Sequence, residues 1–205
     1  MDKYAKLEVS LRYWLLGKGF YRALEAMEFA KSYHTGFRKC GLVPEFQHQI
    51  EIAHYARTLS GIMNMESLLC TVFLHDISED HSIEPALLSD RFGADVGNAV
   101  WAMTKKFNGV ERNEDELFRA MARDPLASIA KGCDRDHNLK TMVGVFLPGK
   151  QLSYCDFAEQ RIIPMLKEAR RIFPQQELAY ENIKHVLTGR IALIRAMHEP
   201  ELEAA

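Results

Sequence analysis

Apolar residues recur at intervals of three and four along most of the chain, which is the period of a helix buried on one face. Alternation at every second residue, the pattern of a half-buried strand, is nearly absent. Glycine and proline separate the periodic stretches. Helices are therefore expected in residues 3–16, 21–33, 44–61, 66–77, 82–92, 96–103, 116–122, 125–141, 156–172 and 175–196. This pattern predicts an all-α fold.

Two stretches of the chain depart from the usual amphipathic helical pattern. Residues 66–77 are apolar nearly all round, which is typical of a buried central helix. Residues 108–116 are rich in charge and are expected to form a solvated loop. No repeat, low-complexity tract or linker divides the chain. We therefore expect one domain over residues 1–205, with a core at about 21–145 and C-terminal helices in 150–197 packed on it.

Composition narrows the function classes. The 205 residues are 47% hydrophobic and carry a net charge of −2, which gives no bulk field for binding a nucleic acid. The longest apolar run, residues 68–74, is far shorter than a bilayer span, so no membrane partner is expected. The four cysteines are far apart and form no C-x-x-C pair, which favours reduced thiols in a cytoplasmic protein.

The candidate chemistry begins at the end of the apolar helix. His75 and Asp76 end this stretch, and Glu79 and Asp80 follow within one helical turn. Burying several charges costs several kcal/mol per ion, on the order of magnitude usual for proteins, unless a cation or firm partners compensate. The placement therefore requires a compensating cation or firmly bound partners.

Two further side chains could complete a metal site. His48 shares a helix face with Ile52 and Tyr55, so it is expected to point inward, and Asp134 lies in a polar cluster of an otherwise packable helix. Two imidazoles and two carboxylates suit a borderline to hard divalent ion such as manganese or iron. Taken singly, each residue is more often a core or capping group, and only the combination favours a metal site.

The order H…HD…D on successive helices resembles the HD-domain metal-dependent phosphohydrolases. Within that superfamily the chain resembles the RelA/SpoT-type (p)ppGpp hydrolase domain, and more closely the small stand-alone alarmone hydrolases. Four segments carry the resemblance: 34–41 (HTGFRKCG), 46–48 (FQH), 75–80 (HDISED) and 131–138 (KGCDRDHN). They are similar to the family's H-x-G-Q-x-R-K-x-G loop, its ligand histidine, its H-D-x-x-E-D signature and its K-x-x-D-R-x-H-N segment. The chain departs from the family at Phe37 and Gln49, neither of which would ligate metal.

The resemblance implies roles for individual residues. It implies a single HD-type helical bundle with one divalent metal, typically Mn²⁺, at its centre, although iron or another divalent ion stays open. The implied metal ligands are His48, His75, Asp76 and Asp134. The implied catalytic carboxylates, near the attacking water, are Glu79 and Asp80. The implied nucleotide contacts are Arg38, Lys39 and Asn138. Arg135 and His137 are expected to support the site through hydrogen bonds to its carboxylates.

The expected activity is manganese-dependent removal of the 3′-diphosphate of guanosine tetra- or pentaphosphate, which yields GDP or GTP and pyrophosphate. One alternative keeps the site but changes the substrate to another phosphorylated nucleotide or dinucleotide. A second alternative is a catalytically silent nucleotide-binding or antitoxin-like module. The complete set of ligands and acidic residues favours an enzyme, and the sequence leaves the oligomeric state open.

Overall fold

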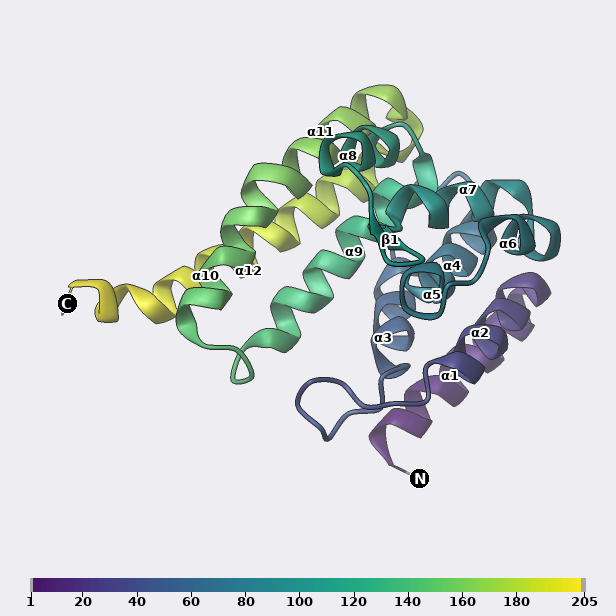
Figure 1. The fold of residues 1–205 in the computed structure, drawn as a ribbon, viewed down its shortest axis with the longest axis horizontal. Helices are drawn as coiled ribbons and strands as arrows, with labels where there is room; N and C mark the ends of the chain where they lie inside the picture. The colour runs from purple at the N-terminus through teal and green to yellow at the C-terminus, as the bar shows by residue number, and fades with distance from the viewer. Residues whose placement is uncertain (1, 204–205) are drawn as a thin grey trace.

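The protein is built from α-helices and one short antiparallel hairpin, as the computed structural model shows for residues 2–203 (Figure 1). The predicted all-α fold is confirmed. The α-helices are α1 (Lys3–Lys18), α2 (Tyr21–Tyr33), α3 (Gln47–Ala56), α4 (Met65–Leu74), α5 (Ile77–His81), α6 (Pro85–Phe92), α7 (Ala94–Met103), α8 (Glu114–Ala122), α9 (Pro125–Met142), α10 (Pro148–Phe157), α11 (Ile163–Ile172) and α12 (Glu177–Glu203). A π-helical segment, η1 (Ala158–Ile162), joins α10 to α11, and a 3₁₀ turn, η2 (Pro174–Gln176), precedes α12. None of the described helices is long and apolar enough to cross a membrane.

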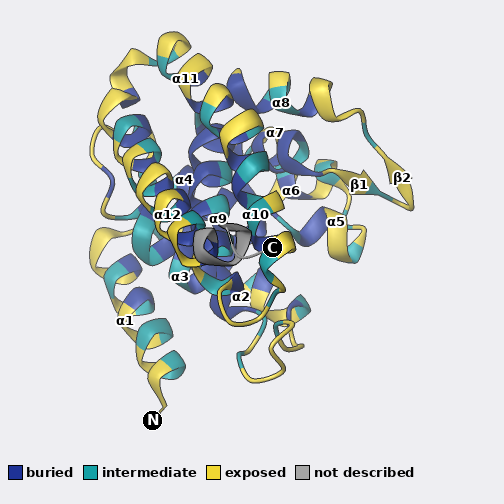
Figure 2. Ribbon diagram, turned by 90° about the vertical axis from the view of Figure 1, so that its left-hand side faces the viewer, coloured by how far each residue is buried: buried dark blue, intermediate teal, exposed yellow. Residues whose placement is uncertain are grey.

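Helix α4 forms the centre of the molecule, as its apolar sequence predicts. Every residue from Ser67 to Leu74 is buried, and α4 packs against α2, α3, α7 and α9 (Figure 2). The buried hydroxyl of Thr71 donates to the Ser67 carbonyl within the helix, so it needs no external partner. Because α4 is surrounded on all sides, the residues at its C-terminal end emerge inside the protein.

The charged stretch at 108–116 is more ordered than a solvated loop. Strands β1 (Lys106–Phe107) and β2 (Val110–Glu111) form a hairpin whose turn residues Asn108 and Gly109 both have positive φ. An Asn-Gly pair favours this type of turn, and this signal in the sequence could have revealed the hairpin. The loop expectation was also wrong at its end, because the Asn113 side chain caps α8 by accepting from the Glu116 amide.

The C-terminal third forms a helical layer on α9. Helix α12 packs against α9, α10 and α11 (Figure 1). The helical stretch expected at 156–172 starts earlier, because α10 begins at Pro148, where proline fits the first turn of a helix. Gly132 permits the close approach of α9 and α12, because a Cβ at this position would lie 2.7 Å from Cγ2 of Ile183.

Three helices carry the predicted ligands into one place. His48 is the second residue of α3, His75 caps the C-terminus of α4, and Asp134 lies in the middle of α9. These three helices contact one another pairwise. The packing of α3, α4 and α9 therefore sets the geometry of the candidate site.

Candidate metal centre

The four side chains predicted as metal ligands converge. Nε2 of His48 lies 3.2 Å from Oδ1 of Asp134 and 3.9 Å from Oδ2 of Asp76. Nε2 of His75 lies 2.9 Å from Oδ2 of Asp76 and 3.8 Å from Oδ1 of Asp134. His48, His75 and Asp134 are buried, and their donor atoms lie within 4.8 Å of one another. Such separations are compatible with ligands that share one cation at about 2.0–2.2 Å each.

His75 is oriented as a metal ligand would be. Its Nδ1 lies 2.8 Å from the Val72 carbonyl, which can only accept, so Nδ1 carries the proton. The buried Nε2 forms no hydrogen bond. A buried nitrogen that faces two carboxylates and makes no hydrogen bond of its own is placed as a metal ligand would be.

The charges at this site also favour a cation. Burial lowers the pKa of His48 to about 4, against the opposing effect of Asp134, so its imidazole is neutral. Burial also disfavours charge on His75, but Asp76 and Asp134 outweigh it and raise the pKa of His75 to about 9. Burial opposes ionisation of Asp76, but His75 lowers its pKa to about 2. In the metal-free protein a proton on His75 therefore occupies the place of the cation.

Asp134 is held in place from its own helix. Nζ of Lys131 lies 3.0 Å from Oδ2, and Nδ2 of Asn138 donates to Oδ1 at 2.6 Å. Burial raises the pKa of Asp134, but the Lys131 charge and the neighbouring histidines hold it well below its usual range. The side-chain oxygen Oδ1 of Asn138 accepts from the Arg38 guanidinium at 3.3 Å. Two residues that the resemblance assigns to the nucleotide thus also support a metal ligand.

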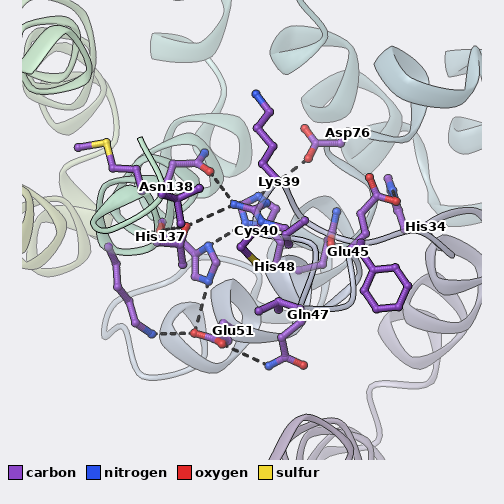
Figure 3. A pocket seen from close by; sticks show the side chains of 18 of the residues that line it. His34, Lys39, Cys40, Glu45, Gln47, His48, Glu51, Asp76, His137 and Asn138 are labelled. Atoms are coloured by element: carbon purple, nitrogen blue, oxygen red, sulfur yellow. Dashed lines mark hydrogen bonds and ion pairs between the residues drawn. The ribbon is translucent and has the colours of Figure 1, made fainter. Parts of the chain in front are cut away.

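A chain of contacts behind His48 fixes its orientation. Nδ1 of His48 lies 2.8 Å from Nδ1 of His137, and Nε2 of His137 lies 3.4 Å from Oε2 of Glu51 (Figure 3). A proton on Nε2 of His137, facing Glu51, leaves its Nδ1 to accept from His48. Nε2 of His48 is then the unprotonated nitrogen that faces the carboxylates. Sequence reasoning missed Glu51, although it lies three residues after His48 on the same helix face.

His137 and Arg135 behave differently from each other. His137 supports the site, as expected, although it contacts His48 and Glu51 rather than a predicted ligand carboxylate. The expectation that Arg135 hydrogen-bonds a site carboxylate was wrong, because its guanidinium lies over Tyr154 and Phe157, 5.1 and 4.8 Å from their ring centroids. The reason is helical geometry, since adjacent residues on a helix do not share a face.

A cavity of about 550 Å³ opens beside the site, and His48 and Asp76 are among the residues that line it. This volume falls in the range of small-molecule sites. Among the residues that line it are Arg38 and Lys39 from the loop at 34–46, together with Asp76, Asp80 and Asn138. Figure 3 shows Lys39, Asp76 and Asn138 around this cavity. The site therefore combines acidic residues with a basic loop, as a phosphorylated ligand would require.

The two residues of the predicted catalytic pair lie in different surroundings. Burial and the nearby charges of Asp76 and Glu79 raise the pKa of Asp80 to about 6. Both side chains are exposed, but Glu79 points to the hairpin, where its Oε2 accepts from the Lys105 amide at 2.8 Å. Of the two, Asp80 lines the cavity.

Comparison with known proteins shows which proteins the chain resembles in sequence. No protein-family model matches the chain. A probable guanosine-3′,5′-bis(diphosphate) 3′-pyrophosphohydrolase of Synechocystis is 31% identical over 122 residues, which cover 56% of this chain and 16% of the relative. A probable GTP pyrophosphokinase of Mycobacterium leprae is 34% identical over 129 residues, which cover 60% of this chain and 16% of the relative. A guanosine-3′,5′-bis(diphosphate) 3′-pyrophosphohydrolase of Haemophilus influenzae is 31% identical over 131 residues, which cover 60% of this chain and 19% of the relative.

The chain thus matches less than a fifth of the length of these relatives. The matched part nevertheless represents more than half of this chain. Together with the H…HD…D order and the all-α fold, these similarities support the resemblance of the chain to the RelA/SpoT-type HD hydrolase domains.

Proposed function

We propose that the protein is a manganese-dependent hydrolase that removes the 3′-diphosphate of guanosine tetra- or pentaphosphate and releases pyrophosphate. The observation that carries this proposal is the convergence of His48, His75, Asp76 and Asp134 beside a cavity with a basic loop. The names of two relatives, both 3′-pyrophosphohydrolases, support the choice of substrate.

These four side chains would hold the metal, which when bound would supply Lewis acidity toward the diphosphate. In the reaction, a water oxygen forms a bond to the phosphorus next to the ribose. The bond from that phosphorus to the ribose 3′ oxygen breaks, so the products are GDP or GTP and pyrophosphate. Asp80 would accept the proton of the attacking water, because it is the carboxylate of the predicted pair that lines the cavity.

The loop at 34–46 would position the substrate. Arg38 offers a planar fork for phosphate oxygens, and Lys39 offers a mobile point charge. The Arg38 side chain is oriented in advance, since it donates to Asn138 and to Thr141, both at 3.3 Å. Orientation before binding reduces the entropy lost when the nucleotide binds. Glu79 stays a predicted catalytic residue, and its contact with Lys105 also allows it to fix the start of the hairpin.

The loop also supports a second candidate, hydrolysis of another phosphorylated nucleotide or dinucleotide. Phe37 is 67% exposed and lines the cavity at a position where the family has Gln. An exposed aromatic ring can stack on a base without reading its identity. Gln49, the other departure, is buried next to the ligand His48.

Pyrophosphate release with Mn²⁺ tests the proposal, measured for both guanosine alarmones beside a panel of other nucleotides. We expect His75→Ala and Asp134→Asn to reduce the rate at least 10²-fold, since each removes a ligand. The matched control is His185→Ala, which changes an exposed histidine of α12 and should leave the rate unchanged. Absence of metal-dependent turnover on every nucleotide would support the silent nucleotide-binding or antitoxin-like alternative instead.

A further inference from the structure

A second cluster of possible ligands lies in the same cavity. His34 follows α2, Glu45 precedes α3, and Asp80 lies in α5. One donor atom from each of these residues lies within 4.8 Å of the other two. All three line the cavity that holds His48 and Asp76, but none belongs to the metal centre described above.

The surroundings of His34 are the strongest indication that this cluster binds a cation. The residue is 3% exposed, and neither of its ring nitrogens forms a hydrogen bond. Its Nδ1 lies 3.9 Å from Oε2 of Glu45, which is too far for a hydrogen bond. The distance does suit two ligands that each lie about 2.1–2.2 Å from a shared cation. Burial is the main cause of the lowered pKa of His34, so the imidazole is neutral and can ligate.

The loop at 34–46 holds Glu45 beside His34. The Glu45 amide donates to the Gly36 carbonyl at 2.9 Å, and a β-bridge joins Phe37 to Pro44. Oε2 of Glu45 lies 3.2 Å from the position of a Cβ at Gly36, so only glycine leaves the carboxylate undisturbed there. Figure 3 shows the Glu45 carboxylate next to the His34 ring.

The His34 ring is also fixed from its other sides. The ring of Phe46 is stacked with it at 6.5 Å, and the ring of His81 meets it edge-on at 4.9 Å. Among the described residues, neither Glu45 nor Asp80 forms an ion pair with a lysine or an arginine. Two uncompensated carboxylates thus face a buried, neutral imidazole.

We propose that His34, Glu45 and Asp80 form a second divalent-cation site. One imidazole and two carboxylates suit Mn²⁺, and Mg²⁺ less closely, and the three residues offer no thiolate to a softer ion. The site goes beyond the proposed function, which needs a single metal. Because the site lies in the shared cavity, a cation bound there would bind oxygens of a diphosphate. Only this role of the cation, and not its binding, rests on the proposed substrate. Asp80 needs only one oxygen for the cation, so its other oxygen remains available to the cavity.

Titration of the metal-stripped full chain with Mn²⁺ tests the second site, with free Mn²⁺ followed by electron paramagnetic resonance and bound Mn²⁺ by calorimetry. We expect two equivalents in the wild type and one in Glu45→Gln. His75→Ala should also bind one equivalent, and the double variant should bind none. Glu84→Gln is the matched control, because it changes an exposed carboxylate of the same region and should retain two.

A wild type that binds one equivalent, lost in His75→Ala, would overturn the proposal. Two equivalents retained in Glu45→Gln would overturn it as well. Glu45 is partly exposed, with 38% of its side chain accessible, so this variant is expected to fold, and circular dichroism checks this. The result is independent of the proposed function, because stoichiometry is read without substrate. Two bound metals without pyrophosphate release would contradict the hydrolase alone.

Discussion

The charge of Asp80 is expected to lower the stability of the fold while it supports the activity of the site. Its pKa is raised to about 6 by burial and by Asp76 and Glu79, above the value of about 3.8 for a free aspartate. The folded protein therefore binds the Asp80 proton more tightly than the unfolded chain does. The resulting stabilisation is fully present below pH 3.8 and is lost as the pH rises through about 6.

We accordingly expect Asp80→Asn to stabilise the metal-free protein at pH 8 by roughly 1 kcal/mol, because solvent screens most of the charge effect at this exposed side chain. The same change should reduce turnover about 10²–10⁴-fold, the usual contribution of a general base. Urea denaturation at pH 5 and pH 8 measures the first effect, and pyrophosphate release measures the second. A variant less stable than the wild type at pH 8 would show that the Asp80 charge is compensated.

Glu51 should act on the metal through His137 and His48. We expect Glu51→Gln to weaken Mn²⁺ binding about 10–100-fold, as removal of outer-shell partners commonly does. The matched control is Lys140→Met, which removes the surface partner of Glu51, 2.7 Å away, and leaves His137 untouched. Calorimetric titration measures both variants. Equal loss in the two would show that Glu51 acts only as a surface charge.

Metal binding at His75 should be coupled to pH. Because the metal-free pKa of His75 is raised to about 9, Mn²⁺ must displace a proton throughout the neutral range. The apparent affinity should rise about tenfold per pH unit between pH 6 and 8. Calorimetry in buffers of different ionisation enthalpy should detect one released proton, most clearly in Glu45→Gln, where one site is expected. An affinity that does not change with pH would mean that His75 is already neutral.

At the scale of elements, substitution of two helical glycines tests how the helices pack, because one glycine lies in a tight helix contact and the other has open space around it. A Cβ on Gly97 in α7 would lie 2.8 Å from the Ser89 amide nitrogen and 2.9 Å from its Cα in α6. Backbone atoms cannot move without separating the two helices, so Gly97→Ala should cost about 3 kcal/mol. Gly189 in α12 has no atom within 4 Å of such a Cβ, and Gly189→Ala should stabilise by up to about 1 kcal/mol. Urea midpoints of the two variants should therefore shift in opposite directions.

Local patterning predicts these elements well where tertiary contacts do not interfere. The expected helix at 21–33 coincides with α2, since Gly19 ends the preceding helix in a left-handed conformation. Pro44 was expected to open a helix, but its bridge with Phe37 delays α3 until Gln47. The helix expected at 66–77 instead ends at Leu74. Each error involves a contact between segments far apart in the chain or a local hydrogen bond that periodicity does not encode.

The candidate site could be predicted only in part for the same reason. His75 and Asp76 are recognisable because charge follows an apolar helix, and the resemblance supplies His48 and Asp134. The partners of these side chains depend on which helix faces meet. The contact of His137 with His48 spans 89 residues of sequence, and no local pattern specifies it.

At the scale of the whole molecule, the metal centre and the C-terminal helices both join distant parts of the chain. Arg190 in α12 donates to both oxygens of Asp136 in α9, at 2.5 and 3.1 Å. The fully buried Gln176 donates to the Pro125 carbonyl at 3.0 Å and accepts from the Met63 amide at 3.1 Å. We propose from these contacts that residues 1–205 fold as one cooperative domain.

Two optical probes can separate one domain from two. The only tryptophans, Trp14 and Trp101, lie in α1 and α7, so their fluorescence reports the N-terminal part, whereas far-ultraviolet circular dichroism also includes α10–α12. One cooperative domain requires the same urea midpoint by both probes. Because the ligands come from α3, α4 and α9, Mn²⁺ should raise both midpoints together, in proportion to RT ln(1 + [Mn²⁺]/Kd). If the dichroism midpoint fell below the fluorescence midpoint, α10–α12 would unfold first and form a separate unit. Since Arg190 binds Asp136 two residues from Asp134, early loss of α12 would also remove a constraint on the helix that carries a metal ligand.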